Sequence, residues 1–259
     1  MSRVLLSLTA VVIISVAASG CGGVAGVGGD SPTPTAVVMV DNSGSTQSLT
    51  KEFKPAIEDA FSRTAANEGQ IWAAGGDNAV LANATWNIDG QKFTAPSEGS
   101  ALQAEDLKQM GKNAANSTNA RLLLARTSRK GSDLVGLLKM AADVLAAHPD
   151  GPRSLLMLTD GGINELGVDL FKDPPKTEAE RTKVIDRFVS NGLLTKDSLT
   201  GGKGAPVKVW LCGVGRGARG NGGLTALYVQ QLWKQMITYA GGELVTSAPS
   251  CSALNGFSS

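Results

Sequence analysis

Histidine and cysteine, which bind most structural zinc ions, are scarce in this sequence. His148 is the only histidine, which excludes sites built from several histidines and argues against a Ser-His-Asp triad. The three cysteines, Cys21, Cys212 and Cys251, lie far apart and form no CxxC pair. Neither a thiolate zinc site nor a thioredoxin-like motif is therefore indicated.

An excess of one charge is also lacking. The chain carries 24 basic and 23 acidic residues, a net charge of +1. This balance shows no electrostatic signature of a nucleic-acid-binding protein, so no nucleic acid partner is expected. Apolar residues make up 42% of the 259 residues, which is enough to bury the core of one α/β domain and argues against wholesale disorder.

The N-terminus has a long apolar run, but it is too short to span a bilayer comfortably. A basic start, an apolar stretch over 4–16 and small residues up to position 20 are typical of a signal peptide, residues 1–20. The segment Ala18-Ser19-Gly20-Cys21 resembles a bacterial lipobox, in which the signal is cut and the cysteine is acylated, although leucine is commoner at its first position. An ordinary cleaved signal and an uncleaved anchor are the alternatives.

Residues 21–35 are rich in glycine and then in proline and threonine, which indicates a flexible tether. With Cys21 acylated, we expect the chain to be held by lipid to a bacterial cell membrane, facing outside the cytoplasm. The lipid bilayer is then one of its partners.

Beyond residue 35, apolar strands alternate with amphipathic helices. Strands are predicted at 36–40, 70–74, 80–88, 122–125, 154–159, 207–214 and 243–247. Helices are predicted at 49–66, 104–114, 134–145, 178–191 and 224–240, the fourth opening with Thr177 and Glu180 in capping-box spacing. This alternation predicts an α/β fold: one domain, about 36–250, with a doubly wound, mostly parallel sheet flanked by helices, and a C-terminal tail over 251–259.

Two of the apolar strands are each followed by an aspartate, Asp41 and Asp160. The carboxyl ends of parallel strands share one edge of a sheet, so these two carboxylates can converge there. Side chains of Ser43 and Ser45 can point into the same pocket, and Ser132 adds a hydroxyl where the helix at 134–145 begins. A few oxygen ligands suit Mg²⁺ or Mn²⁺ better than zinc or copper.

Three segments resemble those of the von Willebrand factor A family. Asp41-Asn42-Ser43-Gly44-Ser45 matches the DxSxS signature of that family. Gly131-Ser132-Asp133-Leu134 resembles its Gly-Thr-Asp-Leu segment, with serine for threonine, and Leu158-Thr159-Asp160-Gly161 resembles its third element. The order of the three also agrees, and the resemblance covers about residues 36–250.

The resemblance implies a Rossmann-like fold with a metal-ion-dependent adhesion site. In such a site Ser43 and Ser45 bind Mg²⁺ or Mn²⁺ directly, Asp41 and Asp160 act directly or through water, and Ser132 takes the role of the threonine. An open coordination position accepts the carboxylate of an exposed Asp or Glu of a partner protein. The resemblance thus implies a protein-binding, adhesion-type module rather than an enzyme.

Other interpretations of the same residues are possible. Asp41 and Ser43 taken alone are typical of a turn and a helix N-cap. The chain could also be an accessory or assembly subunit of an envelope complex. A metal-assisted phosphatase with Asp41 as nucleophile is a third hypothesis, but such enzymes usually need a second aspartate where this chain has Ser43.

The two remaining cysteines, Cys212 and Cys251, follow the carboxyl ends of strands that we expect to be parallel neighbours. In an oxidising compartment, a disulfide between them is plausible. Two buried thiols are the alternative.

Overall fold

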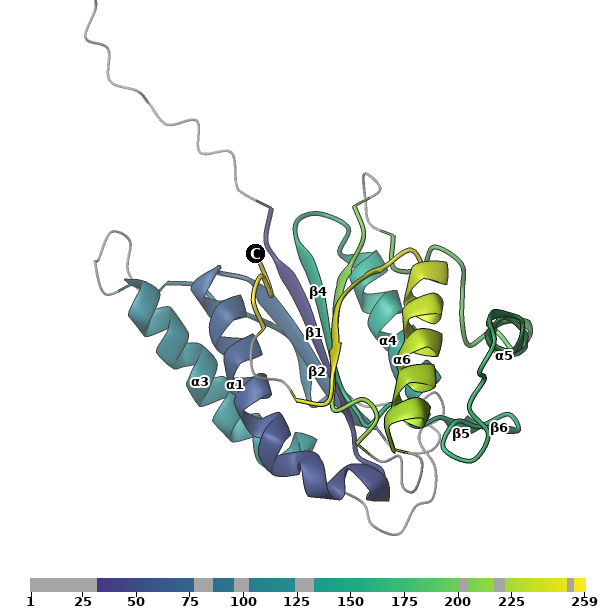
Figure 1. Ribbon diagram of the computed structural model, residues 1–259. Coiled ribbons are helices and arrows are strands. Elements are labelled where there is room, and N and C mark those ends of the chain that lie inside the picture. Colours follow the sequence, from purple (N-terminus) through teal and green to yellow (C-terminus); the bar gives the residue numbers. More distant parts are fainter. Residues whose placement is uncertain are drawn as a thin grey trace, which may run out of the picture. The chain divides into compact units, whose positions relative to one another are not determined.

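A six-stranded sheet forms the centre of the domain, with helices on both faces (Figure 1). The computed structural model describes residues 32–76, 86–95, 103–123, 133–200, 205–216, 222–250 and 254–259, which belong to one unit, Pro32–Ser259. The strands of the sheet are β1 (Thr35–Asp41), β2 (Gln70–Gly76), β3 (Ile88–Lys92), β4 (Arg153–Leu158), β7 (Lys208–Cys212) and β8 (Glu243–Ala248). The helices are η1 (Gly44–Leu49), α1 (Thr50–Ala66), α3 (Gln103–Leu122), α4 (Leu134–Ala147), α5 (Glu178–Ser190) and α6 (Gly222–Tyr239). A separate hairpin consists of β5 (Asn164–Glu165) and β6 (Val168–Asp169).

The order of strands in the sheet, β3-β2-β1-β4-β7-β8, confirms the predicted doubly wound α/β fold. All neighbouring pairs are parallel except β2 and β3, which are antiparallel. The chain adds β2 and β3 on one side of β1 and then returns to place β4 on the other side. The order therefore reverses between β1 and β4, and ligands of open α/β sheets bind outside the carboxyl ends of the strands at such a point.

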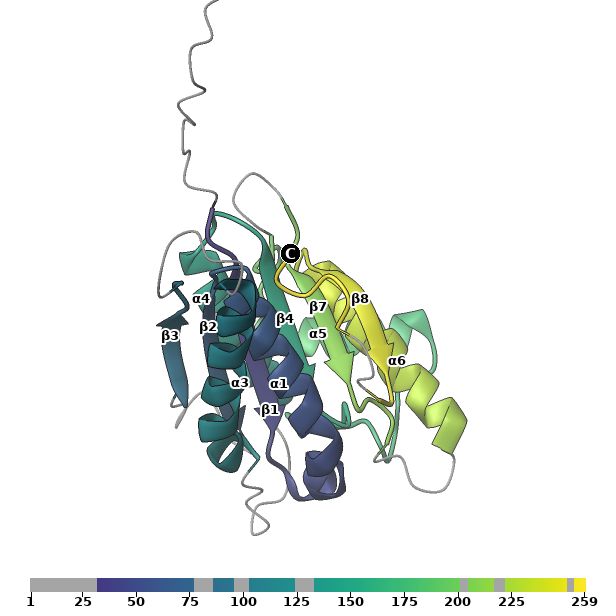
Figure 2. The ribbon, with the colours of Figure 1, turned by 90° about the vertical axis from the view of Figure 1, so that its left-hand side faces the viewer.

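The unbroken apolar run of β1 is explained by burial on both faces of the sheet. Val37 and Met39 pack in a core with α4 and α6, whereas Ala36, Val38 and Val40 pack in a second core with α1 and α3. Each of the five is at most 1% exposed. Figure 2 shows α1 and α3 lying in front of the sheet. Successive residues of a single strand thus contribute to two separate cores.

Helix α3 is longer than predicted and replaces a predicted strand. Instead of ending near 114, α3 continues to Leu122, so the strand predicted at 122–125 is wrong at its start; residues 124 and 125 lie outside the described ranges. Leu107, Ala115 and Leu122 are buried in the core with α1, and helical spacing places them near one face. Burial of that face explains why the helix persists through a polar stretch.

The edge strand β3 also lies elsewhere than predicted. The sequence predicts a strand at 80–88, but β3 begins at Ile88; residues 80–85 lie outside the described ranges. Asn87 donates its backbone N–H to the Ala73 carbonyl over 2.9 Å, and its side-chain oxygen accepts the Gly75 N–H over 3.1 Å. A side chain thus replaces a backbone acceptor at this point, which ends the regular ladder.

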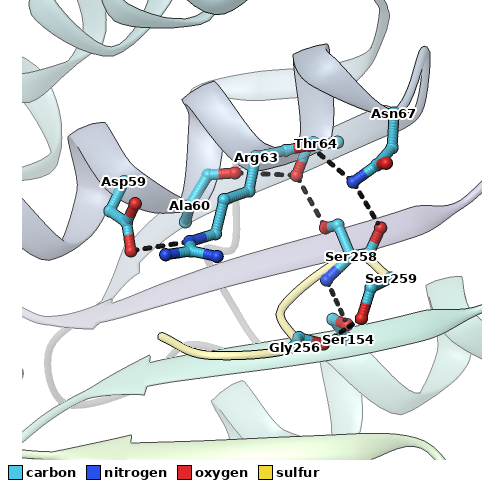
Figure 3. A network of polar contacts seen from close by, with 9 residues as sticks. All are labelled: Asp59, Ala60, Arg63, Thr64, Asn67, Ser154, Gly256, Ser258 and Ser259. Carbon is cyan, nitrogen blue, oxygen red and sulfur yellow. Dashed lines mark hydrogen bonds and ion pairs between the residues drawn. The ribbon is translucent and has the colours of Figure 1, made fainter. Parts of the chain in front are cut away.

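The described part of the C-terminal tail, residues 254–259, packs into the domain (Figure 3). Phe257 is 1% exposed, and its ring centroid lies 5.1 Å from that of Trp210. Ser258 donates its N–H to Ser154 Oγ over 3.0 Å and shares a 2.8 Å hydrogen bond with the Thr64 hydroxyl. These residues complete the core with α1, although they lie beyond the predicted boundary at residue 250.

The predicted means of membrane attachment lies in a part of the chain that the structure does not describe. The signal peptide, Cys21 and most of the tether fall within residues 1–31. Among the described residues, no helix is both long and apolar enough to cross a bilayer.

Candidate metal centre

Asp41 is buried at the carboxyl end of β1, and the loop that follows is wrapped around it. The side chain is 2% exposed, and its Oδ1 accepts the Ser43 N–H over 2.9 Å. The Thr46 hydroxyl donates to the backbone carbonyls of Asp41 over 2.7 Å and of Ser43 over 2.9 Å. Local hydrogen bonds therefore hold this loop in one conformation.

The hydroxyl groups of Ser43 and Ser45 lie side by side, with their oxygens 3.0 Å apart. Ser43 is the N-cap of η1, yet its side chain makes no capping hydrogen bond. This finding argues against the interpretation of Ser43 as a simple N-cap, because the hydroxyl is turned toward Ser45 instead. Ser43 is buried and Ser45 is exposed, so the two hydroxyl groups lie at the boundary between the interior and the surface.

Asp160 comes from the end of β4, the strand that neighbours β1. It is fully buried, and its Oδ1 accepts the Gly162 N–H over 2.9 Å. Its Oδ2 is buried and has no hydrogen-bond partner among the described residues. Burial raises the pKa of this carboxyl, and the nearby Ser45 hydroxyl acts in the opposite direction. An acceptor in this position costs free energy unless something else pairs with it.

Thr159 links the two strands, a role that the sequence did not reveal. Its hydroxyl donates to Asp41 Oδ2 over 2.9 Å and accepts the Gly161 N–H over 2.9 Å. The Gly161 carbonyl in turn accepts the Trp233 indole N–H over 3.0 Å. The orientation of Asp41 is thus set by a chain of hydrogen bonds that reaches α6. A hydroxyl residue next to a candidate ligand was the only sequence signal of this role.

The ionisation of both buried carboxyl groups is disfavoured. Burial, and then the negative charge of Asp160, raise the pKa of Asp41 to about 7. Burial also raises the pKa of Asp160. No Lys or Arg among the described residues forms an ion pair with Asp160. A divalent cation between the two groups would supply the missing positive charge.

The chemistry of these side chains fits a hard cation. Within the described residues, no group of three or more His, Cys, Asp or Glu side chains could hold a metal ion. The candidate centre instead brings together two carboxylates and two hydroxyls, which are oxygen ligands of the kind that Mg²⁺ prefers.

Ser132, the fifth predicted ligand, lies in the segment 124–132, outside the described ranges. Its neighbour Asp133 caps α4, accepting the Gly136 N–H over 2.8 Å, and α4 packs against β1. The described chain therefore resumes one residue after Ser132, at a helix that lies against the strand carrying Asp41.

An acidic side chain near the start of α4, in addition to Asp133, was not predicted as a candidate residue from the sequence. Glu165 lies on β5, and burial, followed by the negative charge of Asp133, raises its pKa to about 8. Its Oε1 is buried without a hydrogen-bond partner among the described residues. A two-residue strand gives no periodic signal, so nothing in the sequence indicated that this glutamate is half-buried.

The cysteines are placed only in part. Cys212 ends β7, is 1% exposed and takes part in a disulfide bond. The strands β7 and β8 are parallel neighbours, as predicted. Cys21 and Cys251 lie outside the described ranges, so lipidation of the first and pairing of the second with Cys212 stay predictions.

Comparisons with known proteins yield structural likenesses only. No protein-family model matches this chain, and no curated protein matches its sequence. The pilus adhesin SpaC from Lactobacillus rhamnosus GG is similar in structure over 87% of this chain and 29% of its own, with 12% identity and a TM-score of 0.46. The conserved hypothetical protein BatB from Bacteroides thetaiotaomicron is similar over 87% of this chain and 95% of its own, with 14% identity and a TM-score of 0.45. Proximal thread matrix protein 1 from the mussel byssus, with a zinc-occupied MIDAS motif, is similar over 81% of this chain and 48% of its own, with 14% identity and a TM-score of 0.32.

Proposed function

We propose that this chain is a binding module that holds a protein ligand through a divalent metal ion. Asp41, Ser43, Ser45 and Asp160 would hold Mg²⁺ or Mn²⁺, together with Ser132 from the adjoining segment. The ion would keep one position open for an Asp or Glu carboxylate of the partner. The observation that carries the proposal is the buried pair of aspartates, one with an unpaired oxygen, beside two converging serine hydroxyls.

The metal explains features that a purely structural role leaves unexplained. Two buried carboxyl groups with raised pKa values destabilise a fold unless they are neutralised. The resemblance to the von Willebrand factor A signature is a second support, because each of the five motif positions in this chain has a side chain with an oxygen that can bind a metal ion. Ser45 is exposed, so a bound ion would be within reach of a partner protein.

We further propose that the module is attached by lipid on Cys21 to a bacterial membrane and faces outside the cytoplasm. The signal-like residues 1–20 and the lipobox-like Ala18-Ser19-Gly20-Cys21 support this placement. In that position the module could act as an adhesin or as a subunit of an envelope complex. An enzymatic role is disfavoured, because the serine at position 43 lacks the acid that a phosphatase of this kind needs.

The test is calorimetric titration of the full chain with Mg²⁺ and Mn²⁺. Wild type should bind one ion, and Asp160→Asn should lose measurable binding. This variant keeps the shape of the side chain and removes a buried charge, so we expect it to remain folded. Asp143→Asn, at an exposed position on α4, is the matched control and should bind like wild type. Equal binding by wild type and Asp160→Asn would refute the proposed metal centre.

Once metal binding has been measured, a capture experiment identifies the partner protein. Envelope proteins are passed over the immobilised chain with Mg²⁺ or with a chelator, and the retained proteins are compared. Proteins retained only with Mg²⁺ by wild type, and not by Asp160→Asn, are the expected ligands. Retention that is insensitive to both changes would place binding on another surface.

A further inference from the structure

Asn119, near the end of α3, is a buried carboxamide with no hydrogen-bond partner among the described residues. The residue is 5% exposed, and both Oδ1 and Nδ2 are screened from solvent and unpaired. A carboxamide offers two donor hydrogens and an acceptor oxygen, so burial without any partner costs free energy.

Asn119 lines an open cavity of about 450 Å³ between the first turns of α1 and the last turns of α3. The other lining residues are Thr50, Lys51, Lys54, Asn116 and Leu123. We call this cavity the Asn119 pocket. It is large enough for one or two side chains, and the buried amide of Asn119 belongs to one of the residues that form its wall.

The rim of the Asn119 pocket is positively charged. Lys51 is exposed and forms no ion pair with any described residue. Lys54 is paired with Glu58 at 3.7 Å, but the two side chains are 55% and 33% exposed, so this pair holds the lysine weakly. None of the described residues that line the pocket is acidic. The rim therefore favours a negatively charged ligand.

The pocket adjoins the loop that carries the candidate metal ligands. Helix α1 starts at Thr50, directly after η1, which follows Ser43. At the other wall, the end of α3 approaches the same loop: a Cβ on Gly75 would meet the Asn42 side chain and lie 3.2 Å from the Leu122 carbonyl oxygen. A ligand bound at the metal could thus continue into this pocket.

We propose that the Asn119 pocket binds an acidic peptide segment of the partner, with a peptide group paired to Asn119 and a carboxylate held by Lys51 and Lys54. One peptide group supplies an N–H donor and a C=O acceptor, which match the carboxamide. The idea extends the proposed function, in that the pocket would recognise the stretch next to the carboxylate that completes the metal site. The metal gives attachment and the pocket gives selectivity among acidic partners.

The test uses N-acetyl-Asp-Asp N-methylamide as the probe and the full chain labelled with ¹⁵N-asparagine, in a chelator so that the metal centre is silent. The side-chain amide signal of Asn119 is identified by its loss in Asn119→Leu. We expect this signal to shift saturably with the probe. Lys51→Glu should weaken binding roughly tenfold, whereas Lys183→Glu, an exposed lysine on α5, should leave it unchanged. The isosteric neutral probe N-acetyl-Asn-Asn N-methylamide should bind more weakly.

A stability measurement separates recognition from a structural role. Asn119→Leu removes an unpaired buried polar group, so it should raise Tm while abolishing probe binding. A lowered Tm would mean that buried water already pairs the amide, and it would overturn the proposal. An unshifted Asn119 signal, or equal affinity for Lys51→Glu and Lys183→Glu, would also overturn it. None of these three outcomes affects the metal titration, which uses no probe.

Discussion

Thr159 donates its hydroxyl hydrogen to Asp41 Oδ2 over 2.9 Å, although 118 positions separate the two residues in the sequence. This hydrogen bond joins the ends of β1 and β4 and leaves Asp41 one main orientation. Hydrogen bonds of this kind behind metal ligands typically change metal affinity by about 10–100-fold. The contact therefore gives the most direct test of how the centre is organised.

Replacing Thr159 with valine should weaken Mg²⁺ binding by roughly tenfold or more. Valine has nearly the same shape but cannot donate to Asp41. Calorimetric titration measures the change, and Thr182→Val, at an exposed position on α5, is the matched control. Unchanged affinity would show that Asp41 is oriented without Thr159.

The stability of the metal-free protein should fall as the pH rises from about 5 to 8. The pKa of Asp41 is raised from 3.8 to about 7 in the folded protein, so stability from this group is full below pH 4 and is lost as the pH passes through about 7. For one proton the steepest loss is about 1.4 kcal/mol per pH unit. Denaturant unfolding in a chelator measures this slope.

Asp41→Asn should reduce this slope by up to about 1.4 kcal/mol per pH unit, because the amide does not titrate, and the share that comes from Glu165 should remain. Mg²⁺ should reduce the slope as well, since a bound cation stabilises the ionised pair, and Mg²⁺ affinity should itself fall below about pH 7. The same slope in wild type and Asp41→Asn would assign the pH dependence to other groups.

Glu165→Gln should stabilise the protein increasingly as the pH rises from about 5 to 8. Burial and the neighbouring Asp133 raise the pKa of Glu165 from 4.5 to about 8, so wild type loses stability across this range and the glutamine variant does not. Unfolding at pH 5 and at pH 8.5 measures the difference. A constant difference at both values would contradict the raised pKa.

Gly111→Ala should destabilise the protein by about 1–3 kcal/mol despite the higher helix propensity of alanine. A Cβ at this position on α3 would lie 2.6 Å from the Phe61 carbonyl oxygen of α1. Gly223→Ala on α6 is the matched control, because a Cβ there meets nothing within 4 Å. Urea unfolding should therefore show opposite effects for the two variants, and equal effects would mean that α1 and α3 can separate at no cost.

Phe257→Ala should cost about 3–5 kcal/mol of stability, the usual range for a large buried aromatic ring. Met110→Ala, at a position 37% exposed, should cost much less. Both variants are compared by urea unfolding. A small effect of Phe257→Ala would show that the tail packs against a core that is stable without it.

Sequence patterns could predict the central strands and the two aspartates because the signals there are local. The apolar runs that precede Asp41 and the pair Thr159-Asp160 are unbroken, since both strands are covered on both faces of the sheet. The capping box of Thr177 and Glu180 is equally local and is confirmed at the start of α5.

Features that depend on distant contacts could not be predicted. The extension of α3 to Leu122 rests on its packing against α1, and the tail is held by Phe257 and Ser258, which have no periodic pattern. Whether the Ser43 hydroxyl caps a helix or faces a ligand pocket depends on its rotamer, which the sequence does not specify. The bond between Thr159 and Asp41 requires the two strands to be neighbours, which is known only once the fold is.

The register of β1 and β4 determines how far apart the two carboxylates can lie. Val40 pairs with Leu158, so Asp41 and Asp160 extend from adjacent strands just beyond this pair. Hydrogen bonding fixes the spacing of such strands at about 4.8 Å, and it changes only if the sheet itself shears. A cation held between the ends of these strands would have rigid surroundings. The spacing of the backbone would then determine which ionic radius fits. Side-chain substitutions would then alter how tightly an ion is held far more than which size of ion is preferred.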